Sequence, residues 1–234
     1  MTKAYNAFRH HKRRGTLWVG SILNLEIHSR LKISGICGIL TPIVAFSCIL
    51  SSIAYAPDFS WADNALSDLG VMPNPTAILF NLGLVISGIL AIAFAVGFFS
   101  LFKGKSVGRA GALLFLMDCL ALTAIGVFPE TSKPMHLYAS VAFFALFPLS
   151  MFFITTSFIL ASKSKMAAFT FSVSVFAAAV WVAEFWVQYV PGVAIPETLS
   201  AIAASVWAVA NGFIMLRTRS QSVGQSVRNS AVCE

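Results

Sequence analysis

Apolar and polar residues alternate along this chain in long blocks rather than residue by residue. Six blocks are almost free of charge and each holds 18 to 27 residues: 31–55, 76–102, 110–128, 135–161, 167–190 and 199–216. A helix needs ~20 apolar residues to cross the ~30 Å hydrocarbon core of a bilayer, and each block approaches or exceeds that length. The pattern therefore predicts an all-α fold, a polytopic six-helix transmembrane bundle with short loops.

The two ends of the chain differ from these blocks. Residues 1–30 are basic and mix a few apolar residues with polar ones, which predicts a cytoplasmic segment at the membrane interface. No short apolar core with a small-residue cleavage site follows the basic residues, so a cleaved signal peptide is not expected. Residues 217–234 are polar and rich in Ser, which predicts a disordered cytoplasmic tail. The transmembrane domain is accordingly expected at 31–216.

Positive charge gathers on one side of the predicted bundle. Of the 16 Lys and Arg residues, all but Lys133 fall in or beside the N-terminal segment, the connections at 103–109 and 163–165, and the C-terminal tail. The opposite connections are acidic. Because positively charged loops stay in the cytoplasm, this asymmetry predicts cytoplasmic N- and C-termini in a multi-pass protein of the plasma membrane. It also explains the net charge of +7 without nucleic acid as a partner.

The composition supports a membrane protein. The chain is 58% hydrophobic and 11% charged, whereas charged residues make up roughly a quarter of a soluble domain. Cys37, Cys48 and Cys119 lie inside apolar blocks, and Cys37 and Cys48 are three helical turns apart, too far for a disulfide. These cysteines are expected to be packing residues.

Some residues have a predicted structural role. Gly83 and Gly88 allow close helix approach. The phrase Pro-Glu-Thr occurs in two predicted outer turns, at 129–131 and 196–198, and is typical of a helix start. The aromatic residues near the outer boundary are assigned to an interfacial belt with no binding role: Tyr55, Trp61, Trp181, Trp186 and Tyr189.

Polar residues collect in the outer loops and in the first turns of the helices beside them. A compact bundle would bring them around one outward-facing mouth: Ser67, Asp68, Asn74, Asn81, Glu130, His136 and Glu197. A structural network of caps and loop braces explains such residues, and so does a pocket for a lipid headgroup or small polar ligand. A carboxylate with His136 also suits acid–base catalysis. No zinc-type His or Cys spacing occurs, so no metal ligands are assigned.

Two carboxylates lie inside predicted spans. Asp118 is near the middle of the third block and Glu184 is in the fifth. An ionised carboxylate in the bilayer costs about 2.5–3.5 kcal/mol or more, and no Lys or Arg lies at the same depth to pair with it. Both carboxyls are therefore expected to face the bundle interior. They suit either a proton relay or a polar contact that clamps helices together, with Ser87, Thr123 and Asn211 as candidate partners.

Several phrases occur together in an order typical of one family. They are NALSDLG before the second block, FNLGL at its start, GVFPETSKPMH before the fourth block, and IPETLS before the sixth. In these, residues 31–216 resemble the six-span prokaryotic membrane family "domain of unknown function 998". The resemblance implies Ser67, Asp68, Gly70, Asn81, His136 and Glu197 as the positions of interest. It implies no activity. The first hairpin is also distantly similar to Frag1/DRAM-type membrane proteins.

Three functions follow as hypotheses. The first is a membrane protein whose outward polar mouth binds a membrane lipid or small polar ligand through Ser67, Asp68, Asn81, Glu130, His136 and Glu197. The second is a lipid-modifying enzyme, with or without a metal ion, in which His136 is the base and Asp68 or Glu130 its partner or a metal ligand. The third is a proton-coupled transporter that uses Asp118 and Glu184. The sequence names no cofactor and no oligomeric state.

Overall fold

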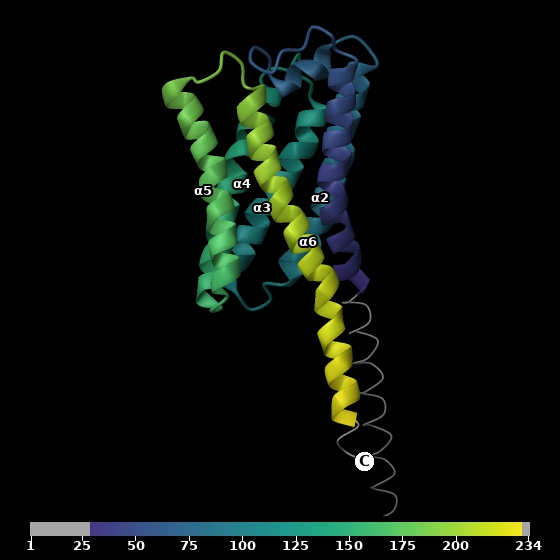
Figure 1. The fold of residues 1–234 in the computed structure, drawn as a ribbon, viewed down its shortest axis with the longest axis vertical. Coiled ribbons are helices and arrows are strands. Elements are labelled where there is room, and N and C mark those ends of the chain that lie inside the picture. Colours follow the sequence, from purple (N-terminus) through teal and green to yellow (C-terminus); the bar gives the residue numbers. More distant parts are fainter. Residues whose placement is uncertain (1–28, 231–234) are drawn as a thin grey trace, which may run out of the picture.

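The structure, a computed structural model, describes residues 29–230, and the side chains up to Arg217. Within this range all regular elements are helical. Six helices are long and apolar enough to cross a membrane, and they stand side by side as an upright bundle (Figure 1): Ser29–Ala54, α2 (Thr76–Ser100), α3 (Ser106–Val127), α4 (Met135–Leu160), α5 (Ser164–Val187) and α6, whose span is Ala194–Arg217. A short 3-10 helix, η1 (Leu66–Val71), lies in the first loop. The all-α six-span prediction is confirmed.

Some helix boundaries differ from the prediction. The sixth helix begins at Ala194 rather than near residue 199, because Pro196 falls in its first turn, where a missing N–H costs nothing. The helix then continues to Ser230, where the sequence predicts a polar, disordered tail; no proline follows Pro196 to interrupt it. Pro129 does not start a helix, since α4 begins only at Met135. Of the predicted interfacial segment, residues 1–28 lie outside the described residues.

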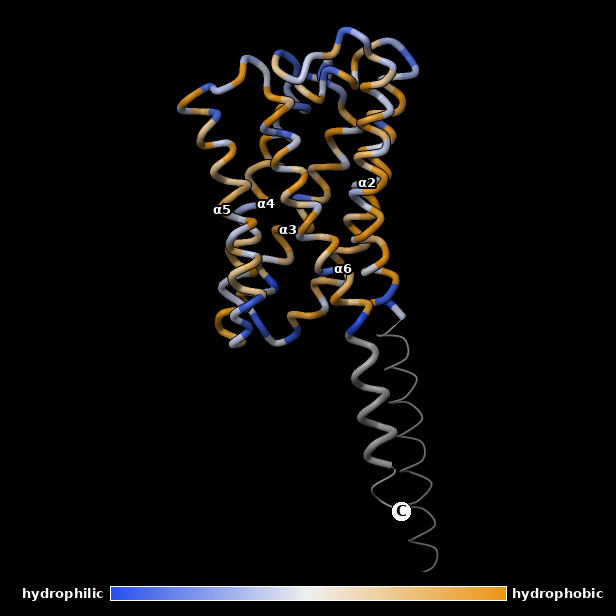
Figure 2. Tube along the Cα trace, viewed as in Figure 1, coloured by the Kyte–Doolittle hydropathy of each residue, from blue (hydrophilic) through white to orange (hydrophobic). Residues whose placement is uncertain are grey.

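The bundle has two distinct ends. The connections at 55–75, 128–134 and 188–193 share one end, called the loop end below, and the turns at 101–105 and 161–163 share the other, the basic end. Hydrophilic residues concentrate at both ends and hydrophobic residues between them (Figure 2). Large apolar side chains on the outside are highly exposed, for example Leu160 at 73% and Phe185 at 79%. Such a surface suits lipid rather than water.

Small residues set the closest helix contacts. A Cβ atom on Gly88 of α2 would lie 2.2 Å from Thr123 Oγ1 of α3, and one on Gly83 would lie 2.3 Å from Cys48 Cβ of the N-terminal helix. The predicted close approach at both glycines is confirmed. A third contact joins the first helix to the last, since a Cβ on Gly35 would lie 2.8 Å from the carbonyl oxygen of Gly212. The N-terminal helix therefore packs against both α2 and α6.

An aromatic cluster fills the centre of the bundle. Trp207 of α6 is fully buried, and its ring lies 5.0 Å from Phe98, 5.1 Å from Phe115 and 6.0 Å from Phe94, all measured between centroids. Its indole Nε1 donates to Thr170 Oγ1 of α5 at 3.2 Å, so the polar edge of the ring is satisfied as well. The three free cysteines of the described residues lie among such packing contacts.

Candidate functional site

Asp68 holds the first loop in shape. Its Oδ2 atom accepts hydrogen bonds from the side-chain amide of Asn64 at 2.7 Å and from the backbone N–H of Ala65 at 3.0 Å. Asn64 in turn accepts the backbone N–H of Ser60 at 2.9 Å. These bonds satisfy backbone N–H groups of the loop just before η1. Asp68 therefore braces the loop, as the hypothesis of a structural network predicts.

Glu197 links the first loop to the start of α6. Its Oε2 atom accepts the backbone N–H of Leu66 at 2.6 Å. Two backbone bonds reinforce the link, from Gly192 N–H to Ala62 O at 2.6 Å and from Ala194 N–H to Asn64 O at 2.8 Å. The loops at 55–75 and 188–193 therefore form one polar layer over the loop end.

Three carboxyl groups meet in this layer. Asp68, Glu130 and Glu197 lie close enough for their charges to act on one another. Burial raises the pKa of Glu130, and so do the hydrogen bond that a protonated Glu130 shares with Asp68 and the negative charge of Asp68; Lys133 and His136 lower it. The cluster is acidic, and among the described residues Lys133 and His136 oppose its charge at Glu130.

His136 is buried in the first turn of α4 and is oriented by a backbone group. Its Nδ1 atom lies 2.7 Å from the carbonyl oxygen of Phe128. Because a carbonyl only accepts, Nδ1 carries a proton, and Nε2 faces Ser140 Oγ at 3.4 Å. The enzyme hypothesis pairs His136 with Asp68 or Glu130, but the orienting partner in the structure is this carbonyl.

A cavity of about 810 Å³, here called the rim cavity, opens beside this layer. The 128–134 loop, the first half of α4, α5 and the start of α6 surround it. Its lining includes Ser67, Glu130, Lys133, His136, Ser140, Phe144, Trp181 and Glu197. The rings of Phe144 and Trp181 pack with centroids 4.5 Å apart and form one wall. Trp181, assigned to the aromatic belt from the sequence, is therefore a cavity residue.

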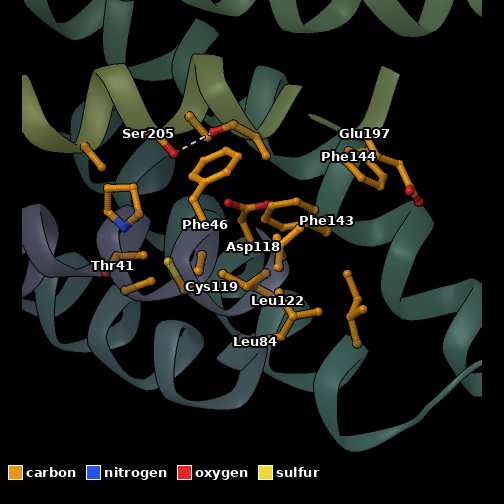
Figure 3. A pocket seen from close by; sticks show the side chains of 18 of the residues that line it. Thr41, Phe46, Leu84, Asp118, Cys119, Leu122, Phe143, Phe144, Glu197 and Ser205 are labelled. Atoms are coloured by element: carbon orange, nitrogen blue, oxygen red, sulfur yellow. Dashed lines mark hydrogen bonds between the residues drawn. The ribbon is translucent and has the colours of Figure 1, made fainter. Parts of the chain in front are cut away.

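A second cavity, the deep cavity, continues between the helices. It measures about 120 Å³, is mostly apolar, and is bounded by the N-terminal helix, α2, α3, α4 and α6. Four residues line both cavities: Ser67, Ser140, Phe144 and Glu197. Figure 3 shows Glu197 and Phe144 at one side of the deep cavity and Asp118 of α3 pointing into its centre. A polar mouth and an apolar interior are thus adjacent.

Some predicted site residues lie outside both cavities. Asn81 lines neither cavity and donates to the carbonyl oxygen of Gly70 at 2.9 Å, which ties η1 to α2. Asn74 is exposed in the loop. Glu184 also lines neither cavity and lies close enough to Tyr189 for its charge to act on that residue. Asp118 and Glu184 therefore do not share one site.

The predicted partners of the intramembrane carboxyls make other bonds. Asn211 donates to the carbonyl oxygen of Trp207 at 2.9 Å, and Thr123 donates to that of Cys119 at 3.0 Å. The side-chain oxygen of Ser87 is buried without a partner. Among the residues that the structure describes, no group of three or more His, Cys, Asp or Glu side chains is arranged to hold a metal ion.

Comparison with known families gives one match. The family model described as "Protein of unknown function (DUF998)" matches residues 39–214, which is most of the chain, four of the six spans in full and most of the other two. The chain belongs to the DUF998 family. This confirms the resemblance read from the sequence, while the likeness to Frag1/DRAM-type proteins stays a prediction. No curated protein and no solved structure matches this DUF998 protein.

Sequence reasoning missed several cavity residues of this DUF998 protein. Ser140, Phe144 and Trp181 are ordinary residues of a membrane helix, and only the packing of α4 against α5 and α6 turns them toward a cavity. One sequence signal was available: His136 and Ser140 are spaced i, i+4, which places their polar side chains on the same helix face.

Proposed function

We propose that this integral membrane protein binds an amphiphilic membrane lipid, with the headgroup in the rim cavity and part of the acyl chain in the deep cavity. The observation that carries the proposal is that Ser67, Ser140, Phe144 and Glu197 line both cavities, so a polar mouth leads directly to an apolar interior. Ligand sites commonly combine such an apolar lining with a few polar groups that fix orientation.

The charges around the mouth favour a headgroup that carries a positively charged amine. Asp68, Glu130 and Glu197 are mutually close, against one lysine and one histidine. Trp181 and Phe144 add aromatic faces to the same cavity. Carboxylates beside aromatic rings suit ethanolamine and choline groups, because a cation is attracted both to the negative charge and to the face of a ring.

The charge distribution supports one orientation of the bundle in the membrane. The basic end carries the Lys and Arg residues of the 103–109 and 163–165 connections, and the loop end is acidic. With the basic end in the cytoplasm, the rim cavity faces outward from the plasma membrane. The lipid is then taken from the outer leaflet.

A lipid-modifying enzyme is the second candidate, favoured by the geometry of one histidine. The Nε2 atom of His136 faces Ser140 Oγ at 3.4 Å, and both residues line the rim cavity. A base beside a hydroxyl group suits acyl transfer or ester hydrolysis. Release of fatty acid from bound lipid, lost in His136→Ala and in Ser140→Ala, would favour this candidate over binding alone.

Native mass spectrometry tests the binding proposal. The protein is exchanged in mild detergent with equal amounts of phosphatidylcholine, phosphatidylethanolamine and phosphatidylglycerol. We expect the two amine lipids to be retained over the anionic one, and Glu130→Gln combined with Glu197→Gln to weaken their retention about tenfold, the effect of ~1.4 kcal/mol. Gln at 197 can still accept the Leu66 N–H, so the loop contact survives.

The matched control is Glu184→Gln, which neutralises a carboxyl that lines neither cavity. It should leave lipid retention unchanged. Equal retention of all three lipids, or equal loss in the control and in the double variant, would contradict the proposal.

A further inference from the structure

Asp118 is a carboxyl group without a hydrogen-bond partner at the centre of an apolar cavity. Its side chain comes from α3, is 2% exposed, and points into the deep cavity between Phe46 and Phe143 (Figure 3). Its Oδ1 atom is buried and accepts no hydrogen bond. A buried polar atom without a partner lowers the stability of the fold by about 1–3 kcal/mol. That loss of stability points to a function for this carboxyl group.

Two hydroxyl groups of the deep cavity are also available only as acceptors. Thr41 of the N-terminal helix donates its hydroxyl hydrogen to the carbonyl oxygen of Cys37 at 2.8 Å. Ser205 of α6 donates to the carbonyl oxygen of Ala201 at 2.7 Å (Figure 3). With their hydrogens used inside their own helices, the two oxygens offer lone pairs to a guest. A guest that bonds to one of these oxygens, or to Asp118, must be a hydrogen-bond donor.

The deep cavity supplies no positive charge of its own. No Lys or Arg lines it, whereas several phenylalanine rings do. A carboxyl group taken out of water is ionised only with an opposite charge beside it, and ring faces attract the same kind of ion. An ammonium group meets both demands, because it carries three donors and no acceptor.

We propose that the deep cavity binds the ammonium group of a small lipophilic amine, with Asp118 as the counter-ion. Its volume of about 120 Å³ is below that of a cavity of about 150 Å³ that holds benzene, so only a compact apolar body fits beside the ammonium group. The guest enters from the rim cavity, past Glu197. This site stands apart from the headgroup proposal, in which the deep cavity receives only an acyl chain.

Equilibrium dialysis of radiolabelled benzylamine and benzyl alcohol against the full chain in mild detergent at pH 7 tests the site, with protein-free micelles as the blank. The two probes share the benzyl body and differ in charge. We expect benzylamine to bind at least tenfold more tightly than benzyl alcohol, and Asp118→Asn to remove that preference. Glu184→Gln, the control carboxyl outside both cavities, should keep it. Equal binding of the two probes, or an unchanged preference in Asp118→Asn, would overturn the inference.

Further variants separate this site from the rim. If Glu130→Gln with Glu197→Gln abolishes benzylamine binding while Asp118→Asn keeps it, the ammonium sits at the rim; the inference is then overturned while the headgroup proposal stands. If lipid selection fails but benzylamine binding depends on Asp118, the headgroup proposal is overturned and the inference stands. Should Asp118→Asn not fold, the two probes are compared on the wild-type chain and on the double variant Glu130→Gln with Glu197→Gln. A benzylamine preference kept in the double variant supports the inference, and a preference lost there would overturn it.

Discussion

Glu197 accepts a hydrogen bond from the backbone N–H of Leu66 at 2.6 Å, across 131 positions of the sequence. The bond fixes the first loop to the last membrane helix, and Glu197 lines both cavities as well. One side chain thus has a structural contact and a place in the candidate site. Substitutions at 197 must therefore be chosen to separate the two roles.

Glu197→Ala leaves the N–H of Leu66, a buried residue, without its acceptor. We expect the free energy of unfolding to fall by about 1–3 kcal/mol, measured by denaturant titration in detergent. Glu197→Gln keeps an oxygen at the same place and should lose much less. A loss in Gln as large as in Ala would show that the charge, rather than the hydrogen bond, stabilises the loop.

Trp207→Ala should be the most destabilising of the tryptophan substitutions in the described part of the chain. Its ring is fully buried against Phe94, Phe98 and Phe115, so truncation leaves a large void and should cost about 3–5 kcal/mol. Trp186 is 78% exposed, and Trp186→Ala should change stability by no more than about 0.5 kcal/mol. Thermal unfolding of both variants in the same detergent compares them directly.

Gly88→Ala should destabilise the α2–α3 pair by about 1–3 kcal/mol. The added Cβ would lie 2.2 Å from Thr123 Oγ1 and 2.8 Å from the Thr123 backbone, so a side-chain rotation cannot relieve the clash. Ile89→Ala, at a neighbouring position that is 57% exposed, is the control and should be close to neutral. Equal melting temperatures for the wild type and Gly88→Ala would contradict the close approach.

Glu130 should give stability a pH dependence that Glu130→Gln lacks. Burial and the hydrogen bond with Asp68 raise the pKa of Glu130 above its ordinary value of 4.5, so the folded state binds this proton more tightly than the unfolded state. The stability that Glu130 contributes is therefore full below pH 4.5 and is lost as the pH rises through the raised pKa. Unfolding of both proteins across pH 4 to 8 measures the difference.

Lys133→Met extends this test. The positive charge of Lys133 lowers the pKa of Glu130, so its removal should move the loss of stability to higher pH. If the free energy of unfolding depends on pH identically in the wild type, Glu130→Gln and Lys133→Met, the interaction of Glu130 with Asp68 and Lys133 is contradicted.

The six spans were predictable because each one is a long apolar block, and hydrocarbon allows little besides a helix for such a segment. The start of α6 was not, although Pro196 and Glu197 are good helix-start residues, because the same phrase at 129–131 lies in a loop. Local chemistry permits a helix start at both places, and the loop contacts of Gly192 and Ala194 decide between them.

The candidate site was predictable only in part. The sequence places Asp68, Glu130, His136 and Glu197 at one end of the bundle, and the structure brings them together. It also predicts that Asp118 faces inward. The cavities themselves depend on how six helices pack, which no single segment encodes. For that reason Asn81 was grouped with the mouth although it braces η1.

The contact between Gly35 and Gly212 has a consequence for the order of assembly. It joins the first described helix to α6, and those same two helices form opposite walls of the deep cavity. During synthesis the first span enters the membrane long before the last one exists. The cavity therefore lacks one of its walls until the sixth helix is inserted.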